Sequence, residues 1–222
     1  MPIRTHSGRA RAAALATLAV AAGVLAAAPA AASAATGPAA LSAPPARAVA
    51  ASGPAFLAPG QLPPHPSSPW YAGPVTNGTP DPLPFCVGQA LPGATSQYRE
   101  FWTELDTGAT QVTVVERDTA RARSLAALWN KAIRECADRT EQEDPDVTAE
   151  WRGYGKLAVE EGARVQGVHL ERTGGASDVH LFAVGRDGRT VTVVRWGQMG
   201  TFDDAPVRAF KNTTRTAVNK LW

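Results

Sequence analysis

Six stretches of the chain have the alternation of apolar and polar positions that is typical of β-strands. Turn residues separate neighbouring stretches, such as Asp106-Thr107-Gly108 after the first and the two-residue hairpin signal Asp187-Gly188 before the last. The pattern therefore predicts strands over residues 98–105, 111–117, 147–157, 163–172, 178–186 and 189–198.

Two further stretches repeat their apolar positions in steps of three and four, which predicts amphipathic helices. Asp118 or Thr119 can cap the first, and Asp203 or Asp204 can cap the second, with Pro206 in its first turn. The apolar stripes consist of Ala122, Leu125, Ala126, Trp129, Ile133 and Cys136 in the first helix, and Val207, Phe210, Thr214, Ala217 and Leu221 in the second.

The order of these elements is β-β-α-β-β-β-β-α, which predicts an α+β fold. Hairpin connections dominate, so we expect a mostly antiparallel sheet of about six strands. Two helices with one apolar stripe each are expected to cover one face of the sheet. The other face would then stay at least partly open and could bind a ligand or a partner.

The first 35 residues have the three-part layout of a secretory signal peptide. Three arginines are followed by an apolar, alanine-rich run and by the Ala32-Ser33-Ala34 cleavage pattern. The alternative is an N-terminal membrane anchor, but the apolar run is short for a span of about 20 residues. We therefore expect residues 1–35 to be removed and the protein to be secreted and extracellular, with no membrane span in what remains.

Residues 36–67 consist almost entirely of alanine, proline, glycine and serine. Such a composition buries too little apolar surface to offset the entropy lost on ordering, so it predicts a flexible linker. The remaining region, residues 68–222, has the length of one domain.

The charge balance argues against a nucleic-acid partner. The whole chain has 22 basic and 20 acidic residues, and removing the arginines of the signal peptide leaves the remainder near neutrality. Nucleic-acid binding would call for a basic surface.

Only two cysteines occur, Cys86 and Cys136. Outside the cell a disulfide can form and persist, so one bridge between them is expected. The alternative is two free thiols. A catalytic thiol is less favoured, because no histidine lies near either cysteine in the sequence.

The chain resembles the PknH-like extracellular sensor domains, which occur on mycobacterial serine/threonine kinases and in secreted or lipid-anchored actinobacterial proteins. The resemblance rests on a secreted chain with a Pro/Ala linker, on "LPFCVGQALPG" and "RARSLAALWNKAIREC", and on the element order over residues 68–222. It implies a single α+β domain with a ligand-binding cleft and no catalytic residues. This chain has no kinase domain and one cysteine pair, whereas the kinase-linked members have two bridges.

Four residues on predicted strands are expected to line the open face, where aromatic and polar groups could bind a small molecule: Trp151, Tyr154, Arg195 and Trp196. Ordinary core packing is the alternative for each.

Two histidines are candidate metal ligands. His169 and His180, with a carboxylate such as Asp178, could bind a metal ion. Their spacing in the sequence is looser than in most metal sites, so no metal site is predicted.

No serine lies in a G-x-S-x-G context, and no cofactor motif is present. The sequence thus predicts a secreted, non-catalytic sensor-type domain that binds an unknown small molecule or cell-envelope component. Two alternatives remain open: a small cell-wall or ester hydrolase, and a secreted inhibitor or protein-interaction module.

Overall fold

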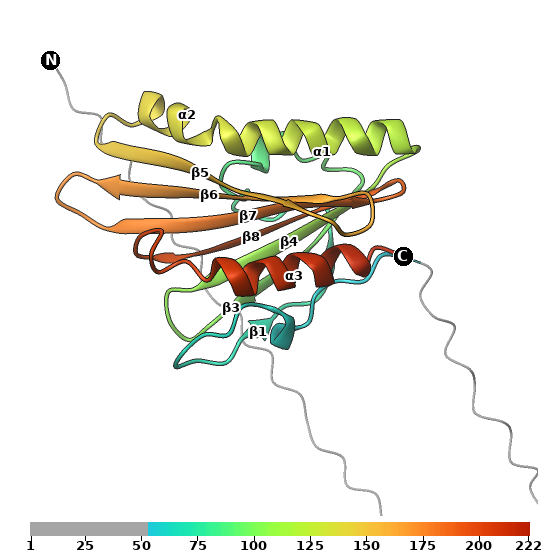
Figure 1. Ribbon diagram of the computed structural model, residues 1–222, viewed down its shortest axis with the longest axis horizontal. Coiled ribbons are helices and arrows are strands. Elements are labelled where there is room, and N and C mark those ends of the chain that lie inside the picture. The colour runs from blue at the N-terminus through green and yellow to red at the C-terminus, as the bar shows by residue number, and fades with distance from the viewer. Residues whose placement is uncertain (1–52) are drawn as a thin grey trace, which may run out of the picture. The chain divides into compact units, whose positions relative to one another are not determined.

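The computed structural model describes residues 53–222 and has three layers, with a central sheet between helices (Figure 1). The helices are α1 (Thr119–Arg134), α2 (Cys136–Glu143) and α3 (Val207–Asn219), with short 3₁₀ turns η1 (Pro59–Gln61) and η2 (Gly88–Ala90). The strands are β1 (Tyr71–Ala72), β2 (Thr76–Asn77), β3 (Ser96–Trp102), β4 (Gly108–Val115), β5 (Val147–Leu157), β6 (Ala163–Arg172), β7 (Ser177–Asp187) and β8 (Thr190–Met199). No helix within this part of the chain combines the length and the apolar character needed to cross a membrane.

The α+β class and the mostly antiparallel sheet are confirmed. The sheet has eight strands in the order β1-β3-β4-β8-β7-β6-β5, with β2 also paired to β3, and every pair is antiparallel. The six long strands are the six expected from the sequence, and the two-residue strands β1 and β2 are additional. The β7–β8 loop is Gly188-Arg189, one residue later than expected, because Asp187 still pairs with Thr190.

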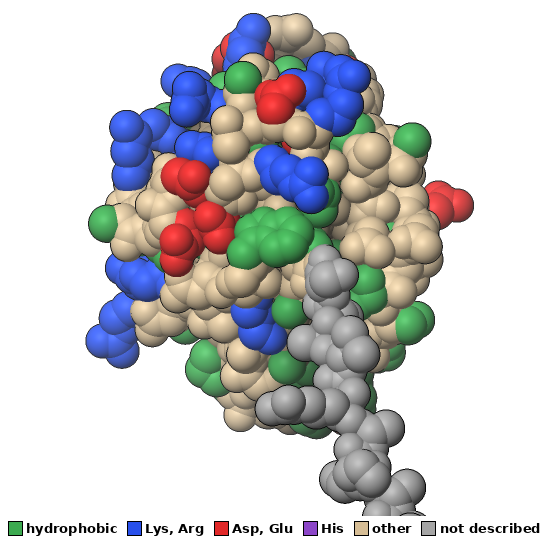
Figure 2. Space-filling view, turned by 90° about the vertical axis from the view of Figure 1, so that its right-hand side faces the viewer, with side chains coloured by type: hydrophobic (Ala, Val, Ile, Leu, Met, Phe, Trp, Pro, Cys, Tyr) green, Lys and Arg blue, Asp and Glu red, His purple; other side chains and the backbone are tan. Residues whose placement is uncertain are grey.

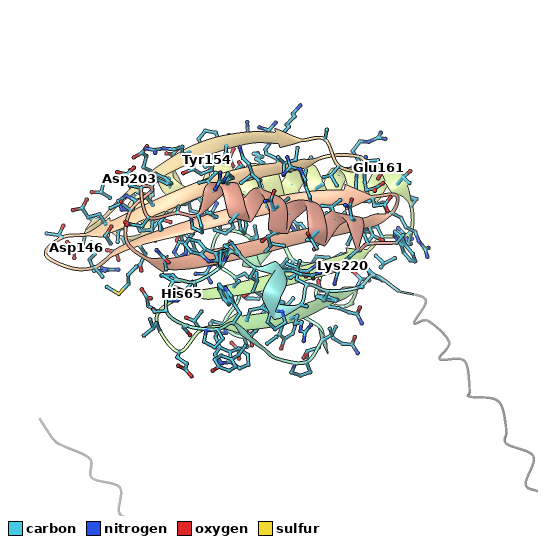
Figure 3. All side chains as sticks on the ribbon, turned by 60° about the horizontal axis from the view of Figure 1, so that its bottom comes forward. His65, Asp146, Tyr154, Glu161, Asp203 and Lys220 are labelled. Atoms are coloured by element: carbon cyan, nitrogen blue, oxygen red, sulfur yellow. A yellow bond between two sulfur atoms is a disulfide. The ribbon has the colours of Figure 1, made fainter. Side chains whose placement is uncertain are left out.

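The expectation that both helices cover one face of the sheet is wrong. α1 and α2 pack on one face and α3 packs on the other, as Figures 1 and 3 show from two directions. Strand β7 shows this directly, because Leu181 packs in the cluster that contains α3 and its neighbour Phe182 packs in the cluster that contains α1. Both faces of the central strands are therefore covered, which explains why "VHLFAV" in β7 is almost continuously apolar.

The helix boundaries follow the sequence only in part. Asp118 caps α1, because its carboxylate accepts a hydrogen bond of 2.8 Å from the backbone N–H of Arg121. The single expected helix is interrupted at Glu135, and α2 begins at Cys136. The expected aspartate cap of α3 is wrong: Pro206 occupies the N-cap position and no side chain caps the helix.

The end of the expected linker is folded onto the domain. Leu57 is fully buried, and its backbone N–H donates to the side chain of Gln111 at 2.8 Å. Lys220 donates to the carbonyl of Phe56 at 2.9 Å, and Thr213 donates to that of Gln61 at 2.7 Å.

The prediction of a flexible linker up to residue 67 therefore placed the end of the linker too late in the chain. A few large apolar side chains within this segment complete the core on the α3 side. The predicted signal peptide and residues 36–52 lie outside the described residues.

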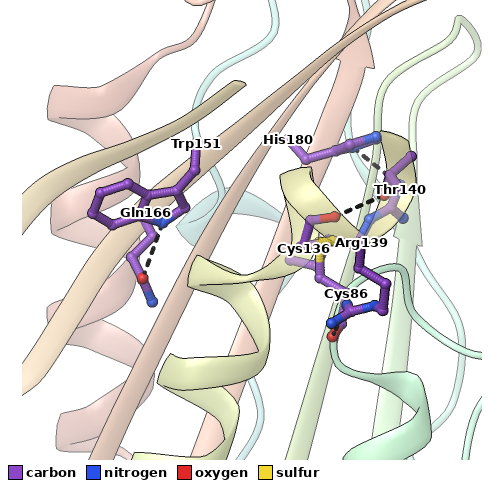
Figure 4. Close-up of a disulfide and its surroundings, with 8 residues drawn as sticks. Cys86, Cys136, Arg139, Thr140, Trp151, Gln166 and His180 are labelled. Carbon is purple, nitrogen blue, oxygen red and sulfur yellow. Dashed lines mark hydrogen bonds between the residues drawn. A yellow bond between two sulfur atoms is a disulfide. The ribbon is translucent and has the colours of Figure 1, made fainter. Parts of the chain in front are cut away.

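The expected disulfide between Cys86 and Cys136 is confirmed, and it joins residues 50 positions apart (Figure 4). It connects the segment before β3 to the first residue of α2. Arg139 adds a hydrogen bond of 3.3 Å to the carbonyl of Cys86. The bridge thus fastens the loop that carries Cys86 to the helical layer.

Candidate ligand-binding site

The four residues expected to form one site lie on two faces of the sheet. Trp151 packs in the cluster that contains α1, whereas Tyr154 and Trp196 pack in the cluster that contains α3. Arg195 lies on the α1 side, beside His180. Neighbours in a strand point to opposite faces, so Arg195 and Trp196 cannot share a site. Both faces of the central strands are covered in the described part of the chain, so these four residues do not share one open face.

Trp151 holds a strand against α1. Its indole N–H donates to Gln166 at 3.1 Å, and the amide of Gln166 donates to Asn130 of α1 at 3.0 Å. Figure 4 shows the bond between the indole and Gln166. Gln166 is only 1% exposed, so the two bonds form a buried polar link between β5, β6 and α1.

Arg195 is mostly enclosed and shares one hydrogen bond of 3.2 Å with Nδ1 of His180. Burial, and then the nearby charge of Arg195, lower the pKa of His180 to about 3. A neutral ring accepts the hydrogen bond from Arg195 at Nδ1 and carries its own proton at Nε2. Within the described residues, Nε of Arg195 has no hydrogen-bond partner. These contacts describe a buried polar pair under Phe85, whose ring centroid lies 5.1 Å from that of His180.

The two histidines considered for a metal do not meet. His169 pairs with Val179 across the β6–β7 ladder, while His180 pairs with Val168, so the two side chains point to opposite faces. His169 instead forms a hydrogen bond of 2.6 Å with Ser177. No group of three or more metal-binding side chains gathers within residues 53–222.

One cleft in the described part of the chain has a volume of about 530 Å³. Three segments form it: the proline-rich stretch 63–67 with Trp70, the β3–β4 loop, and the end of β8 with the turn that follows. We call it the Trp70–Trp196 cleft. Its lining residues include Trp70, Trp196, His65, Leu105, Asp106, Gln198, Met199 and Asp204.

Backbone contacts fix the polar groups of this cleft. Nδ1 of His65 accepts from the N–H groups of Ser67 and Ser68 at 3.3 and 3.1 Å, so a neutral ring presents its Nε2–H. One oxygen of Asp106 accepts from the N–H of Met199 at 3.0 Å, which leaves the second oxygen for a ligand. The side-chain positions are therefore set before any ligand binds.

Two more groups complete the polar wall. One oxygen of Asp204 accepts from the N–H and the hydroxyl of Thr201, and these bonds hold its pKa below the ordinary value. The carbonyl oxygen of Gln198 accepts from Thr107 at 3.3 Å, so its NH₂ group is the part that can donate to a ligand. The cleft thus offers carboxylate acceptors, amide and imidazole donors, and apolar surface.

Trp196 is the one predicted ligand-binding residue that lines this cleft, and it is only 2% exposed. It forms part of the cleft floor, so the half-buried Trp70 presents more of the accessible aromatic surface. The sequence reading missed His65 because it was assigned to the linker, and it missed Asp204 because a helix cap explained that residue. The available signal was a histidine among prolines five positions before a tryptophan, in "PPHPSSPW".

Comparison with protein-family models, with curated proteins and with solved structures gives no match. The resemblance to the PknH-like sensor domains therefore stays a prediction.

Proposed function

We propose that this chain is a secreted, non-catalytic binding protein that holds a small saccharide of the cell envelope in the Trp70–Trp196 cleft. The observation that carries the proposal is the set of polar groups in the cleft, which are fixed by the backbone and face a common space beside apolar side chains. A cleft with apolar walls and a few oriented polar groups is the usual form of a small-molecule site.

The chemistry of the lining favours a hydroxyl-rich ligand over an anion. The charged side chains among the lining residues are the acids Asp106 and Asp204, which accept hydrogen bonds from hydroxyl groups and repel anions. His65 and Gln198 can donate to hydroxyl or acetamido oxygens. The apolar face of a sugar ring can pack against Trp70 and the adjoining prolines, as apolar surfaces do on aromatic rings.

Binding without catalysis fits the state of the histidine. Nδ1 of His65 already accepts two backbone N–H groups, so the exposed nitrogen of the neutral ring is a donor and is not a base that could activate a nucleophile. His65 therefore gives no support to the hydrolase alternative as a general base.

The disulfide supports a location outside the cell. Disulfides persist in oxidising compartments and are rare in the cytosol, and the Cys86–Cys136 bridge agrees with the signal-peptide pattern at the N-terminus. Secretion remains part of the proposal.

The protein-interaction alternative has one observation in its favour. Tyr71 and Trp102 stack at the sheet edge with ring centroids 6.4 Å apart, and they are 38% and 48% exposed. Exposed aromatic residues are enriched at protein interfaces. If the Trp70–Trp196 cleft binds no saccharide, this pair is the next surface to test.

The first experiment is a calorimetric titration of the purified protein with soluble cell-wall saccharides, beginning with a disaccharide of N-acetylated amino sugars. We expect Asp106→Asn to weaken binding about tenfold or more, because a hydrogen bond to a charged group contributes about 1.5–3 kcal/mol. The substitution keeps an oxygen for the N–H of Met199. Asp146→Asn, an exposed acid away from the cleft, should leave the affinity within about twofold.

Mass spectrometry of protein from culture supernatant complements the titration. A native mass that exceeds the denatured mass by a reproducible increment would show a ligand carried from the cell. No increment together with no saccharide binding, or equal weakening in both aspartate variants, would refute the proposal.

A further inference from the structure

A second cleft, of about 420 Å³, lies between α1 and the ends of β5, β6 and β7. It is at the other end of the strands from the Trp70–Trp196 cleft. In Figure 3, His65 of the first cleft and Glu161 of the second lie toward opposite ends of the molecule. Figure 2 faces the end where β5 turns into β6, and lysine and arginine side chains surround much of that surface. We call the second cleft the basic cleft.

Two cations of this cleft are direct neighbours across a strand pair. Lys156 of β5 is the register partner of Arg164 of β6, and Arg164 is in turn the partner of Val184, which packs in the α1 cluster. Both cationic side chains therefore point to the α1 side. Like charges directly opposite each other destabilise a sheet. No ion pair among residues 53–222 offsets the repulsion between Lys156 and Arg164.

A third cation faces this pair from the helix. Arg123 of α1 lines the same cleft. Among residues 53–222, the ion pairs found do not include Arg123, Lys156 or Arg164. Three positive side chains from three elements thus line one cleft, and none of them forms an ion pair with a carboxylate among the described residues.

The one acid in the cleft is already engaged. Glu161 lies 3.5 Å from Arg186, and its other oxygen accepts from the backbone N–H of Gly188 at 2.7 Å. Glu161 therefore balances Arg186 and leaves the other three cations uncompensated. In a domain near neutrality overall, such a local excess creates a positive potential that attracts anions.

The cleft has room and a fixed width. Ala126 and Ala127 of α1 line it, so no long side chain from that turn fills the space. Asn130, one turn further along, also lines it and is held by Gln166, which is bonded to Trp151. This buried link sets the distance between α1 and the strands that carry the cations, and it preorganises them for a ligand.

We propose that the basic cleft binds a phosphate-bearing group. Two guanidinium groups and an ammonium group provide the forked donors and the point charge that recognise phosphate oxygens. A group with two or more negative charges would neutralise the three cations and relieve the repulsion between Lys156 and Arg164. The phosphate could belong to a soluble ester or to the headgroup of an anionic lipid, and the experiment distinguishes these sources.

The test is a calorimetric titration of the purified protein with inorganic pyrophosphate at low ionic strength. We expect binding by the wild type and at least a tenfold loss in the double variant Lys156→Gln/Arg164→Gln. Arg208→Gln removes an exposed charge from α3, on the opposite face, and should change the affinity by less than twofold. The melting temperature of the double variant should equal or exceed that of the wild type, which would show that lost binding is not lost folding.

Sedimentation with vesicles provides the second arm. Vesicles of phosphatidylglycerol and phosphatidylcholine are compared with vesicles of phosphatidylcholine alone. Pyrophosphate binding that the double variant loses, without cleft-dependent sedimentation with phosphatidylglycerol, identifies a soluble phosphate ligand, and sedimentation that the double variant loses identifies a lipid headgroup whether or not pyrophosphate binds. If neither probe binds, or if Arg208→Gln weakens binding as much as the double variant, the proposal is overturned.

The outcome is independent of the saccharide proposal. Asp106→Asn lies in the other cleft and should bind pyrophosphate like the wild type. A protein that binds pyrophosphate but no saccharide would support the basic cleft and refute the saccharide proposal. A protein that binds the saccharide but no phosphate probe would support the saccharide proposal and refute the basic cleft.

Discussion

At the scale of single residues, strand alternation decides which side chains can act together. Arg195 and Trp196 are adjacent in β8 and point to opposite layers, so a site containing both is geometrically impossible. The same rule separates His169 from His180 on neighbouring strands. Of these four residues, His180 and Arg195 lie on the α1 side and form a buried pair, which makes the stability of the protein depend on pH.

We expect the protein to lose stability as the pH falls from about 6.5 toward 3, in part because of His180. Its pKa is about 3 in the folded protein against an ordinary 6.5, so the unfolded chain takes up the proton first. The contribution is complete above pH 6.5 and is lost on acidification. The charged groups near the ring are Arg195 and, beyond it, Asp178.

His180→Gln provides the comparison, because glutamine keeps an oxygen that can accept from Arg195 and does not titrate. Urea unfolding at several pH values should show a smaller loss of stability between pH 6.5 and 3 for the variant than for the wild type. Asp144 and Asp204, whose pKa values are lowered by hydrogen bonds, lose their contributions at lower pH in both proteins. Equal slopes in the two proteins would contradict the assignment.

At the scale of elements, the disulfide joins a loop to the helical layer. Cys136 is 1% exposed and begins α2, and Cys86 belongs to the loop that packs beneath α1. Trp129 of α1 also donates to the carbonyl of Ala90 in this loop at 3.0 Å. The bridge and this hydrogen bond together hold the loop against α1 and α2.

The double variant Cys86→Ala/Cys136→Ala should lower the free energy of unfolding by about 2–5 kcal/mol, the usual effect of removing a native bridge from a small domain. The bridge closes a loop of 50 residues and so restricts the unfolded chain. Urea unfolding at neutral pH measures the change. Wild-type protein under reducing conditions should show a similar loss, and an unchanged midpoint in both experiments would disprove the role of the bridge.

At the scale of the whole molecule, the segment after residue 53 completes the α3 layer. Phe56, Leu57 and Leu62 are buried in the described structure although the surrounding composition is that of a linker. The same segment continues into the wall of the Trp70–Trp196 cleft. Folding of this segment and formation of the cleft are therefore coupled.

Leu57→Ala should destabilise the protein by about 2–5 kcal/mol, as for other buried leucines, because Leu57 is fully buried against the α3 layer. Leu128→Ala is the matched control, since that leucine is 48% exposed on α1 and should change stability by less than about 0.5 kcal/mol. Thermal and urea unfolding of both variants measure the difference. Equal stability of the two variants would mean that the segment does not contribute to the folded core.

The sequence alone determined the elements and the covalent link. Apolar positions that repeat every second residue identified the six long strands, and those that repeat every three to four residues identified the regions of α1 and α3. Both periods can be seen locally, because they follow from the backbone geometry of a strand and of a helix. The pairing of Cys86 with Cys136 followed from there being two cysteines and one possible bridge. The break between α1 and α2 at Glu135 was not predicted, because no proline or glycine marks it in the sequence.

The layer that each element joins depends on contacts between segments that are distant in the sequence. A stripe of apolar residues shows that one side of a helix is buried, but the path of the chain decides which face of the sheet the helix covers. α1 and α3 therefore took opposite faces, and the predicted site divided between two layers. Both clefts arise from segments distant in the sequence, such as residues 63–67 beside the end of β8, or Arg123 opposite Lys156 and Arg164. Contacts of that kind depend on the completed fold, because no local pattern records which distant side chain will lie opposite.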